Sequence, residues 1–150
     1  MCDAILIYEE HFSSAQIAIK ELDDYTSKYN GQSVVTFKHK QKPYLLPYYF
    51  KGNETIEFAS WEPHASLEDF TEFFQVIGAE GVEIPAVAAQ QSSVWFNVEP
   101  RRIRGCLIRR HSDSLIFILV KPASDDFKQM THFDWEPVYV GEESDPEIFN

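Results

Sequence analysis

The longest regular pattern of hydrophobic and polar positions covers residues 103–121. Two apolar runs of strand length flank the polar break His111-Ser112-Asp113, which is the pattern of a β-hairpin. The second run, 115–120, is six apolar residues in succession. It is too short for a membrane span and rich in β-branched residues, so it predicts a strand covered on both faces. We therefore expect the hairpin to form the centre of a sheet.

Two other segments have the period of an amphipathic helix. Ser13 begins a capping-box pattern, and apolar positions follow at spacings of three and four as far as Asn30-Gly31. This pattern predicts a helix over 13–29, with Asn30-Gly31 as its stop signal. Ser66 begins a similar pattern, which predicts a second main helix over 66–77.

The remaining segments favour short strands. The runs 34–39, 44–51 and 55–61 are separated by polar breaks and predict a meander. Pro47 lies inside the second run and has no N–H to donate, so that strand should be an edge strand or contain a bulge. Residues 78–91 show no periodicity, which predicts a long loop or a strained crossover. Further strands are expected over 3–8, 93–98 and 133–140, and a short helix over 124–130.

Runs of strands with few helices between them are typical of the α+β class. We predict one globular domain over 1–150, built on a mainly antiparallel sheet of about six strands that packs against the two main helices. A chain of 150 residues buries roughly 70% of its unfolded surface and needs no disulfide or metal for stability. From about residue 141 the chain is acidic, and we expect a frayed tail there.

The charges are segregated along the chain, and the formal net charge is −11. Residues 52–100 hold nine acids and no Lys or Arg, whereas 101–110 holds five arginines and no acid. Three lysines lie within 38–42, again without an acid. Segregation of this kind can steer a partner of opposite charge, although the blocks can also neutralise one another in the folded chain.

The cysteines and the N-terminus favour a cytoplasmic protein. The chain has two cysteines, Cys2 at the N-terminus and Cys106 in the hairpin, and this usage fits a reducing compartment better than a disulfide-bonded one. The first residues lack a basic segment, and their apolar run is too short for a signal peptide. We expect neither a targeting segment nor a membrane contact.

Five arginines in the first hairpin strand form the sharpest charge pattern. In an extended strand, the candidate anion-binding residues Arg102, Arg104 and Arg110 share one face with Cys106 and Ile108. Three guanidinium groups on one face can hold phosphates or stack on bases. The alternative is that they pair with carboxylates of the chain, and we expect this for at least some of them. The net negative charge also disfavours general nucleic-acid binding.

Motifs for catalysis or metal binding are absent from the sequence. Cys106 has no partner pattern that would activate its thiol, and a buried, inert cysteine is the simpler interpretation. The pairs His111/Asp113 and His132/Asp134 lack the spacing of a metal site. No glycine-rich phosphate loop or serine elbow occurs. We therefore predict no metal, no cofactor and no enzymatic activity.

An acidic, aromatic-rich domain without a catalytic motif is typical of a protein that binds another protein. We predict a bacterial inhibitor of the immunity or antitoxin type, whose acidic surface blocks the basic active-site cleft of a toxin enzyme. One alternative is a phosphate-, nucleotide- or RNA-binding domain that uses Arg101–Arg110. Another is a small enzyme that uses His132 or Cys106, and a homodimer is compatible with each. The predicted partner-binding residues are Trp61, Glu62, Glu68, Asp69 and Glu72.

Overall fold

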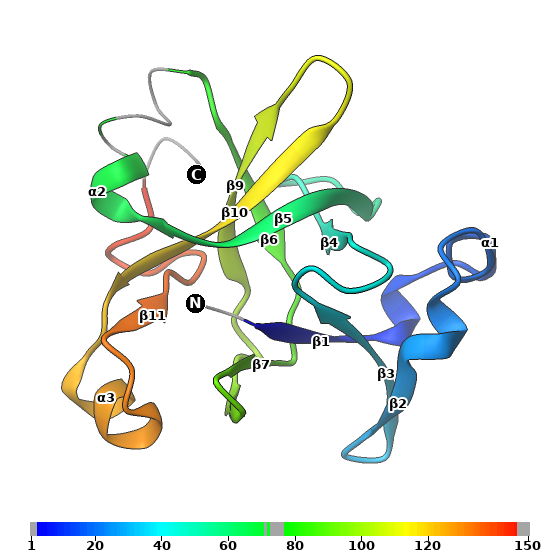
Figure 1. The fold of residues 1–150 in the computed structure, drawn as a ribbon, viewed down its shortest axis with the longest axis horizontal. Coiled ribbons are helices and arrows are strands. Elements are labelled where there is room, and N and C mark those ends of the chain that lie inside the picture. The colour runs from blue at the N-terminus through cyan, green and yellow to red at the C-terminus, as the bar shows by residue number, and fades with distance from the viewer. Residues whose placement is uncertain (1–2, 71, 73–76, 147–150) are drawn as a thin grey trace.

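The computed structural model describes residues 3–70, 72 and 77–146, and this part of the chain is mostly β-structure (Figure 1). Its eleven strands are β1 (Ala4–Tyr8), β2 (Thr26–Tyr29), β3 (Gln32–Lys38), β4 (Leu46–Tyr48), β5 (Glu57–Ser66), β6 (Glu80–Ile84), β7 (Ala88–Gln91), β8 (Val94–Asn97), β9 (Ile103–Arg109), β10 (Ser114–Pro122) and β11 (Trp135–Pro137). The helices are α1 (Ser14–Ile19), α2 (Leu67–Asp69) and α3 (Asp125–Thr131), with 3-10 turns at Glu9–His11 and Leu22–Tyr25. The predicted α+β class with two main helices is therefore wrong.

The first sheet has five antiparallel strands in the order β2-β3-β1-β7-β8. β1 lies at its centre, and its side chains from Ala4 to Ile7 are buried on both faces. A continuous apolar run is what a strand with two covered faces requires, so the predicted first strand is confirmed.

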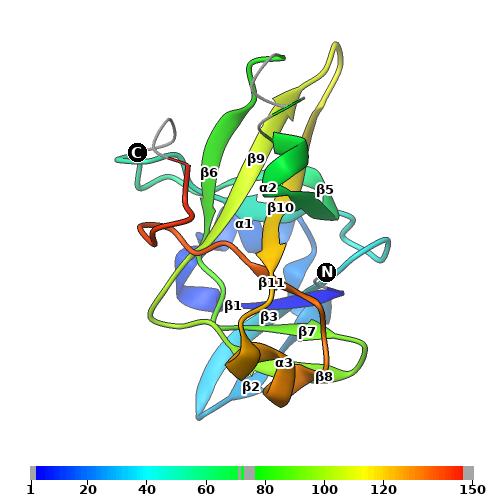
Figure 2. The same cartoon turned by 90° about the vertical axis from the view of Figure 1, so that its left-hand side faces the viewer.

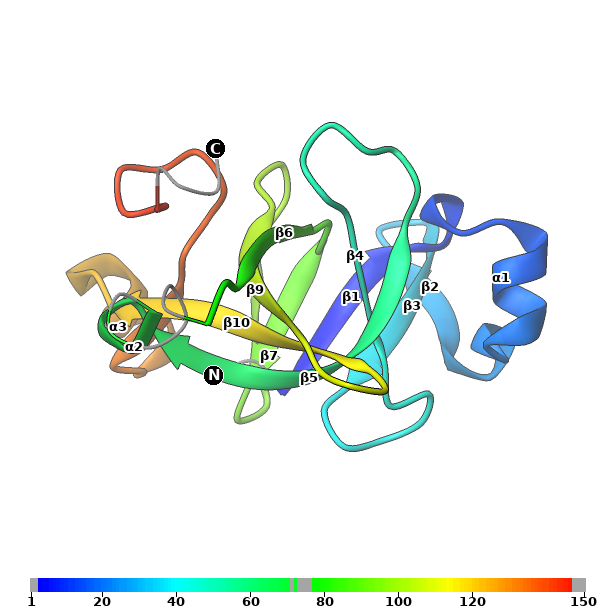
Figure 3. The same ribbon diagram turned by 90° about the horizontal axis from the view of Figure 1, so that it is seen from above.

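The second sheet has the order β4-β5-β10-β9-β6, with β11 added alongside β10. The strands β5 and β10 run parallel and side by side (Figure 3). The sheet curls into a half-barrel, because Tyr49 after β4 and Glu83 on β6 exchange two backbone hydrogen bonds of 2.8 Å each. Pro47 lies opposite Phe58 on the edge strand β4, where its missing N–H removes no bond from an inner ladder.

The predicted hairpin 103–121 is confirmed as β9 and β10, and β10 is an inner strand between β9 and β5. Gly105 lets the curled sheet close tightly at this place. A Cβ atom on Gly105 would lie 3.0 Å from a methyl carbon of Val82 and 3.1 Å from one of Ile116. A larger residue would therefore overpack the interior of the half-barrel.

One hydrophobic core joins the two sheets. Ile5, Ile7 and Phe37 from the first sheet belong to the same buried cluster as Leu107 and Ile116 from the second. The short helix α3 closes the lower end beside β8 (Figure 2), where the rings of Phe127 and Phe96 lie 5.1 Å apart. In the described residues, no helix is long and apolar enough to cross a membrane.

The predicted helix over 13–29 is wrong beyond its first turns. Ser13 does form the capping box with Gln16, but α1 ends at Ile19, and the chain turns through a left-handed residue at Glu21. Residues 26–29 form β2, which pairs with β3 across Asn30-Gly31. Both turn residues have positive φ, as a two-residue hairpin requires. Asn-Gly is therefore the turn of a hairpin here, and not the end of a helix.

The predicted helix over 66–77 begins where expected, because Ser66 Oγ accepts a hydrogen bond from the backbone N–H of Asp69 at 3.1 Å. α2 covers Leu67–Asp69, and part of the predicted remainder, residues 71 and 73–76, lies outside the described residues. The predicted loop over 78–91 is wrong, because it contains β6 and β7. The predicted meander over 34–61 is also wrong, since β3 belongs to the first sheet and β5 to the second.

The acidic segment that begins near residue 141 is folded back onto the second sheet as far as it is described. Asp145 is buried at 4% exposure and forms an ion pair with Arg104. Its carboxylate also accepts a 2.8 Å hydrogen bond from the backbone N–H of Gly141. The expected frayed tail is therefore absent from residues 141–146.

Candidate functional site

The predicted aromatic anchor, Trp61, is not on the surface. Its side chain points into the half-barrel, and the residue is 4% exposed. The reason is strand alternation, which turns Ala59 and Trp61 inward and leaves Ser60 and Glu62 outside. The ring of Trp61 packs edge-on against His39 at 5.3 Å between centroids. Trp61 therefore belongs to the core and cannot insert into a partner in this conformation.

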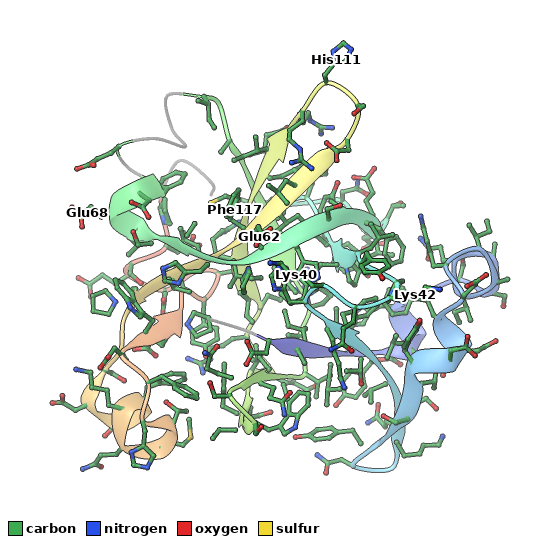
Figure 4. The ribbon with its side chains drawn as sticks, viewed as in Figure 1. Lys40, Lys42, Glu62, Glu68, His111 and Phe117 are labelled. Atoms are coloured by element: carbon green, nitrogen blue, oxygen red, sulfur yellow. The ribbon has the colours of Figure 1, made fainter. Side chains whose placement is uncertain are left out.

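Glu62 lies on the outer face of β5, beside Phe117 of β10 in the register of the two strands (Figure 4). One carboxylate oxygen, Oε2, is 3.1 Å from Nε2 of His39, and the Glu62 side chain remains 43% exposed. Glu62 is thus held in position by its neighbour and still reaches solvent.

Three further predicted acids, Glu68, Asp69 and Glu72, are all exposed at the start of the second helix. The N-terminus of a helix stabilises carboxylates there through its dipole. No described cation forms an ion pair with any of the three. Their negative charge is therefore not compensated by an ion pair within the described part of the chain. We call Glu62, Glu68, Asp69 and Glu72 the acidic face.

A partly buried apolar strip continues from the acidic face across the outer side of the second sheet. It consists of Ile108, Leu115 and Phe117. Leu115 lies opposite Ile108, and Phe117 lies between Cys106 and Glu62. Ile108 and Phe117 pack against the same small cluster as Leu67 and Phe70 of the second helix. Of the acidic face, Glu62 therefore lies directly beside the strip, and the second helix packs against the same cluster.

The structure places a carboxylate against each of the three predicted anion-binding arginines. Arg102 Nη1 lies 3.0 Å from Oε1 of Glu83. Arg110 makes bidentate contacts of 2.7 and 2.6 Å with Asp113 in the hairpin turn. These contacts, and that of Arg104 below, are the internal ion pairs that we expected for at least some of the stripe.

Arg104 is fully buried, in contrast to the other arginines of β9. Its Nε and Nη2 donate to the two carboxylate oxygens of Asp145 at 2.7 and 2.9 Å. This fork-to-fork geometry is the strongest form of an arginine–carboxylate pair. The chain after Gly141 covers the guanidinium, so Arg104 anchors the C-terminal segment and is closed to ligands.

The candidate catalytic residues Cys106 and His132 both have roles in the fold. Cys106 is a free, buried thiol, and burial raises its pKa to about 12, so it is protonated at neutral pH. His132 ends α3 in a left-handed conformation, with its backbone N–H bonded to Lys128. His111 lies at the tip of the hairpin (Figure 4). The described residues contain no group of three or more His, Cys, Asp or Glu that could hold a metal ion.

The structure also brings together residues that the sequence did not indicate. Tyr8, His11, Glu99 and Arg101 line a cleft of about 110 Å³ between the two sheets. They come from the end of β1 and from the connection between β8 and β9, about 90 positions apart in the chain. No short-range pattern links them, and only strand pairing places them side by side.

Searches with this chain found no match among protein-family models, curated proteins or solved structures.

Proposed function

We propose that the protein is an inhibitor of the immunity or antitoxin type, which binds a toxin enzyme through the acidic face and covers its basic active-site cleft. The observation that carries the proposal is the set of exposed carboxylates of Glu68, Asp69 and Glu72, none of which forms an ion pair with a cation in the described part of the chain. Arginines 102, 104, 109 and 110 each have a carboxylate partner, and none of these partners belongs to the acidic face. The pairing inside the fold thus leaves that face negative.

The composition of the surface supports a protein partner. Protein interfaces commonly have an apolar centre and a polar rim. The strip of Ile108, Leu115 and Phe117 supplies partly buried apolar area, and Glu62 lies beside Phe117 at its border. Phe117 takes the place that the sequence assigned to Trp61 as the aromatic contact residue.

A basic cleft is the complementary surface for this arrangement. Nuclease-type enzymes gather Lys and Arg where they hold phosphates, and a patch of carboxylates can occupy the same positions. Complementary charge of this kind speeds the encounter of the partners and selects between them, more than it adds affinity. In this proposal, the protein itself carries out no catalytic step.

The proposal is tested by co-expression with the product of the adjacent gene, which serves as the candidate toxin. We expect the wild-type chain to restore growth to cells that this product poisons. The double variant Glu68→Lys/Asp69→Lys should slow association about tenfold at low salt and reduce its salt dependence. Binding kinetics measured across a salt series provide the readout.

The matched control is Asp125→Lys/Asp126→Lys, because this exposed acidic pair occupies the same first-turn position on α3. It makes the same change in net charge far along the chain from the acidic face. The proposal is wrong if the wild-type chain fails to restore growth, or if both double variants slow association equally.

A further inference from the structure

The cleft between the two sheets is a second candidate binding site, separate from the acidic face. Its lining consists of Tyr8, His11, residues 85–87 and residues 99–102. Both residues of the pair Arg101-Arg102 line it. Two arginines that line one small cavity form an arrangement suited to a compact anion.

Arg101 is the member of the arginine group that has no carboxylate partner among the described residues. Its guanidinium carbon lies 3.6 Å from the centroid of the Tyr139 ring. Stacking on an aromatic face leaves the in-plane N–H groups of arginine available. Stacking also holds the side chain in one orientation, which lowers the entropy cost of binding a ligand.

Arg102 supplies a second guanidinium that is already held in place. Its Nη1 donates to Glu83 at 3.0 Å, and its guanidinium carbon lies 4.9 Å from the centroid of the Tyr49 ring. One carboxylate accepts hydrogen bonds from only some of the five N–H groups of an arginine. The remaining donors can therefore contribute to the cleft.

His11 adds a neutral ring to the same wall. Its Nδ1 lies 3.0 Å from the hydroxyl oxygen of Tyr49. Burial, and then the charge of Arg102, lower the pKa of His11 below 6.5, with Glu10 acting in the opposite direction. A neutral imidazole has one N–H donor and one acceptor, so His11 can hydrogen-bond an anion at neutral pH without a charge of its own.

Glu99 limits the kind of anion that fits. Its Oε2 accepts a 2.8 Å hydrogen bond from the Tyr8 hydroxyl, and the carboxylate lines the cleft. The negative charge of the Glu99 carboxylate repels a large polyanion, and a cavity of about 110 Å³ has no room for one. A single oxyanion group that contacts the arginines avoids most of this repulsion.

We propose that the cleft binds one compact oxyanion, a phosphate or carboxylate group, with Arg101 as the main ligand-binding residue and Arg102 and His11 as its supports. This site is independent of the proposed inhibitor function, because it shares no residue with the acidic face. In this proposal Arg101 is the main anion-binding residue, in place of the three arginines that the sequence predicted.

The experiment titrates the full-length protein with inorganic phosphate and, separately, with acetate, at pH 7 and constant ionic strength. The NMR signals of the His11 ring and isothermal calorimetry report binding. We expect saturable binding of at least one anion, and Arg101→Gln should weaken it at least about tenfold by removing charge-assisted hydrogen bonds. Binding of phosphate alone identifies a phosphate-bearing ligand, and binding of acetate identifies a carboxylate.

Arg110→Gln is the matched control, since it removes the same charge at the hairpin tip, where Arg110 pairs with Asp113. It should leave anion binding unchanged. His11→Gln is a second test that keeps the charge at neutral pH and removes the ring, and it should also weaken binding. Failure of both anions to saturate, or an equal loss in Arg110→Gln and Arg101→Gln, would overturn the proposal.

Discussion

Arg104 and Arg110 show how position alone changes the role of a residue type. Both lie on one face of the same hairpin, and both make bidentate contacts with an aspartate. Arg110 is exposed, and its pair contributes little to stability because water screens it. The side chains of Arg104 and Asp145 are fully buried, so loss of either one removes the opposite charge that compensates the other in a place that water does not reach.

The first prediction is that Arg104→Met lowers the free energy of unfolding by about 3 to 5 kcal/mol, because the buried carboxylate of Asp145 then loses the guanidinium that compensates its charge. Urea denaturation measures the loss. The double variant Arg104→Met/Asp145→Leu should recover most of it, since both charges are gone. A loss below about 1 kcal/mol in the single variant would mean that the pair does not hold the C-terminal segment.

The second prediction concerns Cys106, whose pKa burial raises from 9.0 to about 12. The folded state keeps its proton where the unfolded state loses it. This contribution to stability is therefore complete below pH 9 and falls as the pH rises toward 12. In a Cys2→Ser background, the native thiol should react slowly with a thiol reagent at pH 8 and rapidly in urea. Equally fast labelling in both would show that Cys106 is accessible.

Among the elements, β10 contributes most to the architecture. It pairs with β9, with β5 in parallel and with β11. Its even-numbered residues Ile116 and Ile118 fill the half-barrel, while Leu119 is buried with Cys106 and Val138 on the outer side. Toward its start the outer side is more open, where Leu115 and Phe117 are partly buried.

The third prediction is that Leu119→Ala costs about 2 to 5 kcal/mol of unfolding free energy, the range for deletion of a large side chain from a core. Leu115→Ala is the matched control on the same face of the same strand and should cost less, because Leu115 is partly exposed. Chemical denaturation of both variants measures the difference. A loss below about 1 kcal/mol for Leu119→Ala would contradict the central position of β10.

At the scale of the whole molecule, the formal charge of −11 is distributed unevenly. The arginines of the hairpin are largely compensated, whereas Glu68 and Asp69 of α2 form no ion pair with a cation among the residues that the structure describes. Long-range charge repels a polyanion, and the cleft beside Arg101 admits one small anion only. The proposed inhibitor function therefore predicts a basic protein partner and no binding of nucleic acids.

The fourth prediction is that short RNA and DNA do not bind at physiological salt, where charges are screened beyond about 8 Å. Fluorescence anisotropy with labelled oligonucleotides measures this. Binding that disappears when Arg102, Arg104 and Arg110 are changed to Ala would contradict the prediction, and it would favour the nucleic-acid function that these residues suggested in the sequence.

Several elements followed from the sequence alone, because their signals act over short distances. Strand β1, the central hairpin, the caps at Ser13 and Ser66, and the short helix that follows Ser124 were all predicted. Each depends on a run of apolar residues or on a side chain that bonds to a backbone N–H three positions away. The residues of these elements favour the same secondary structure in nearly any surroundings.

Tertiary structure decided those strands, turns and side-chain positions that depend on residues far away in the sequence. Asn30-Gly31 is compatible with a helix end and with a hairpin, and the neighbouring strand β1 selected the hairpin by pairing with β3. Strands β6 and β7 have weak patterns of their own and exist because β9 and β1 supply their hydrogen bonds. Strand pairing also turned Trp61 inward, buried Arg104 under a segment about forty positions away, and brought His11 to Arg102. Long-range contacts of this kind leave no trace in local periodicity.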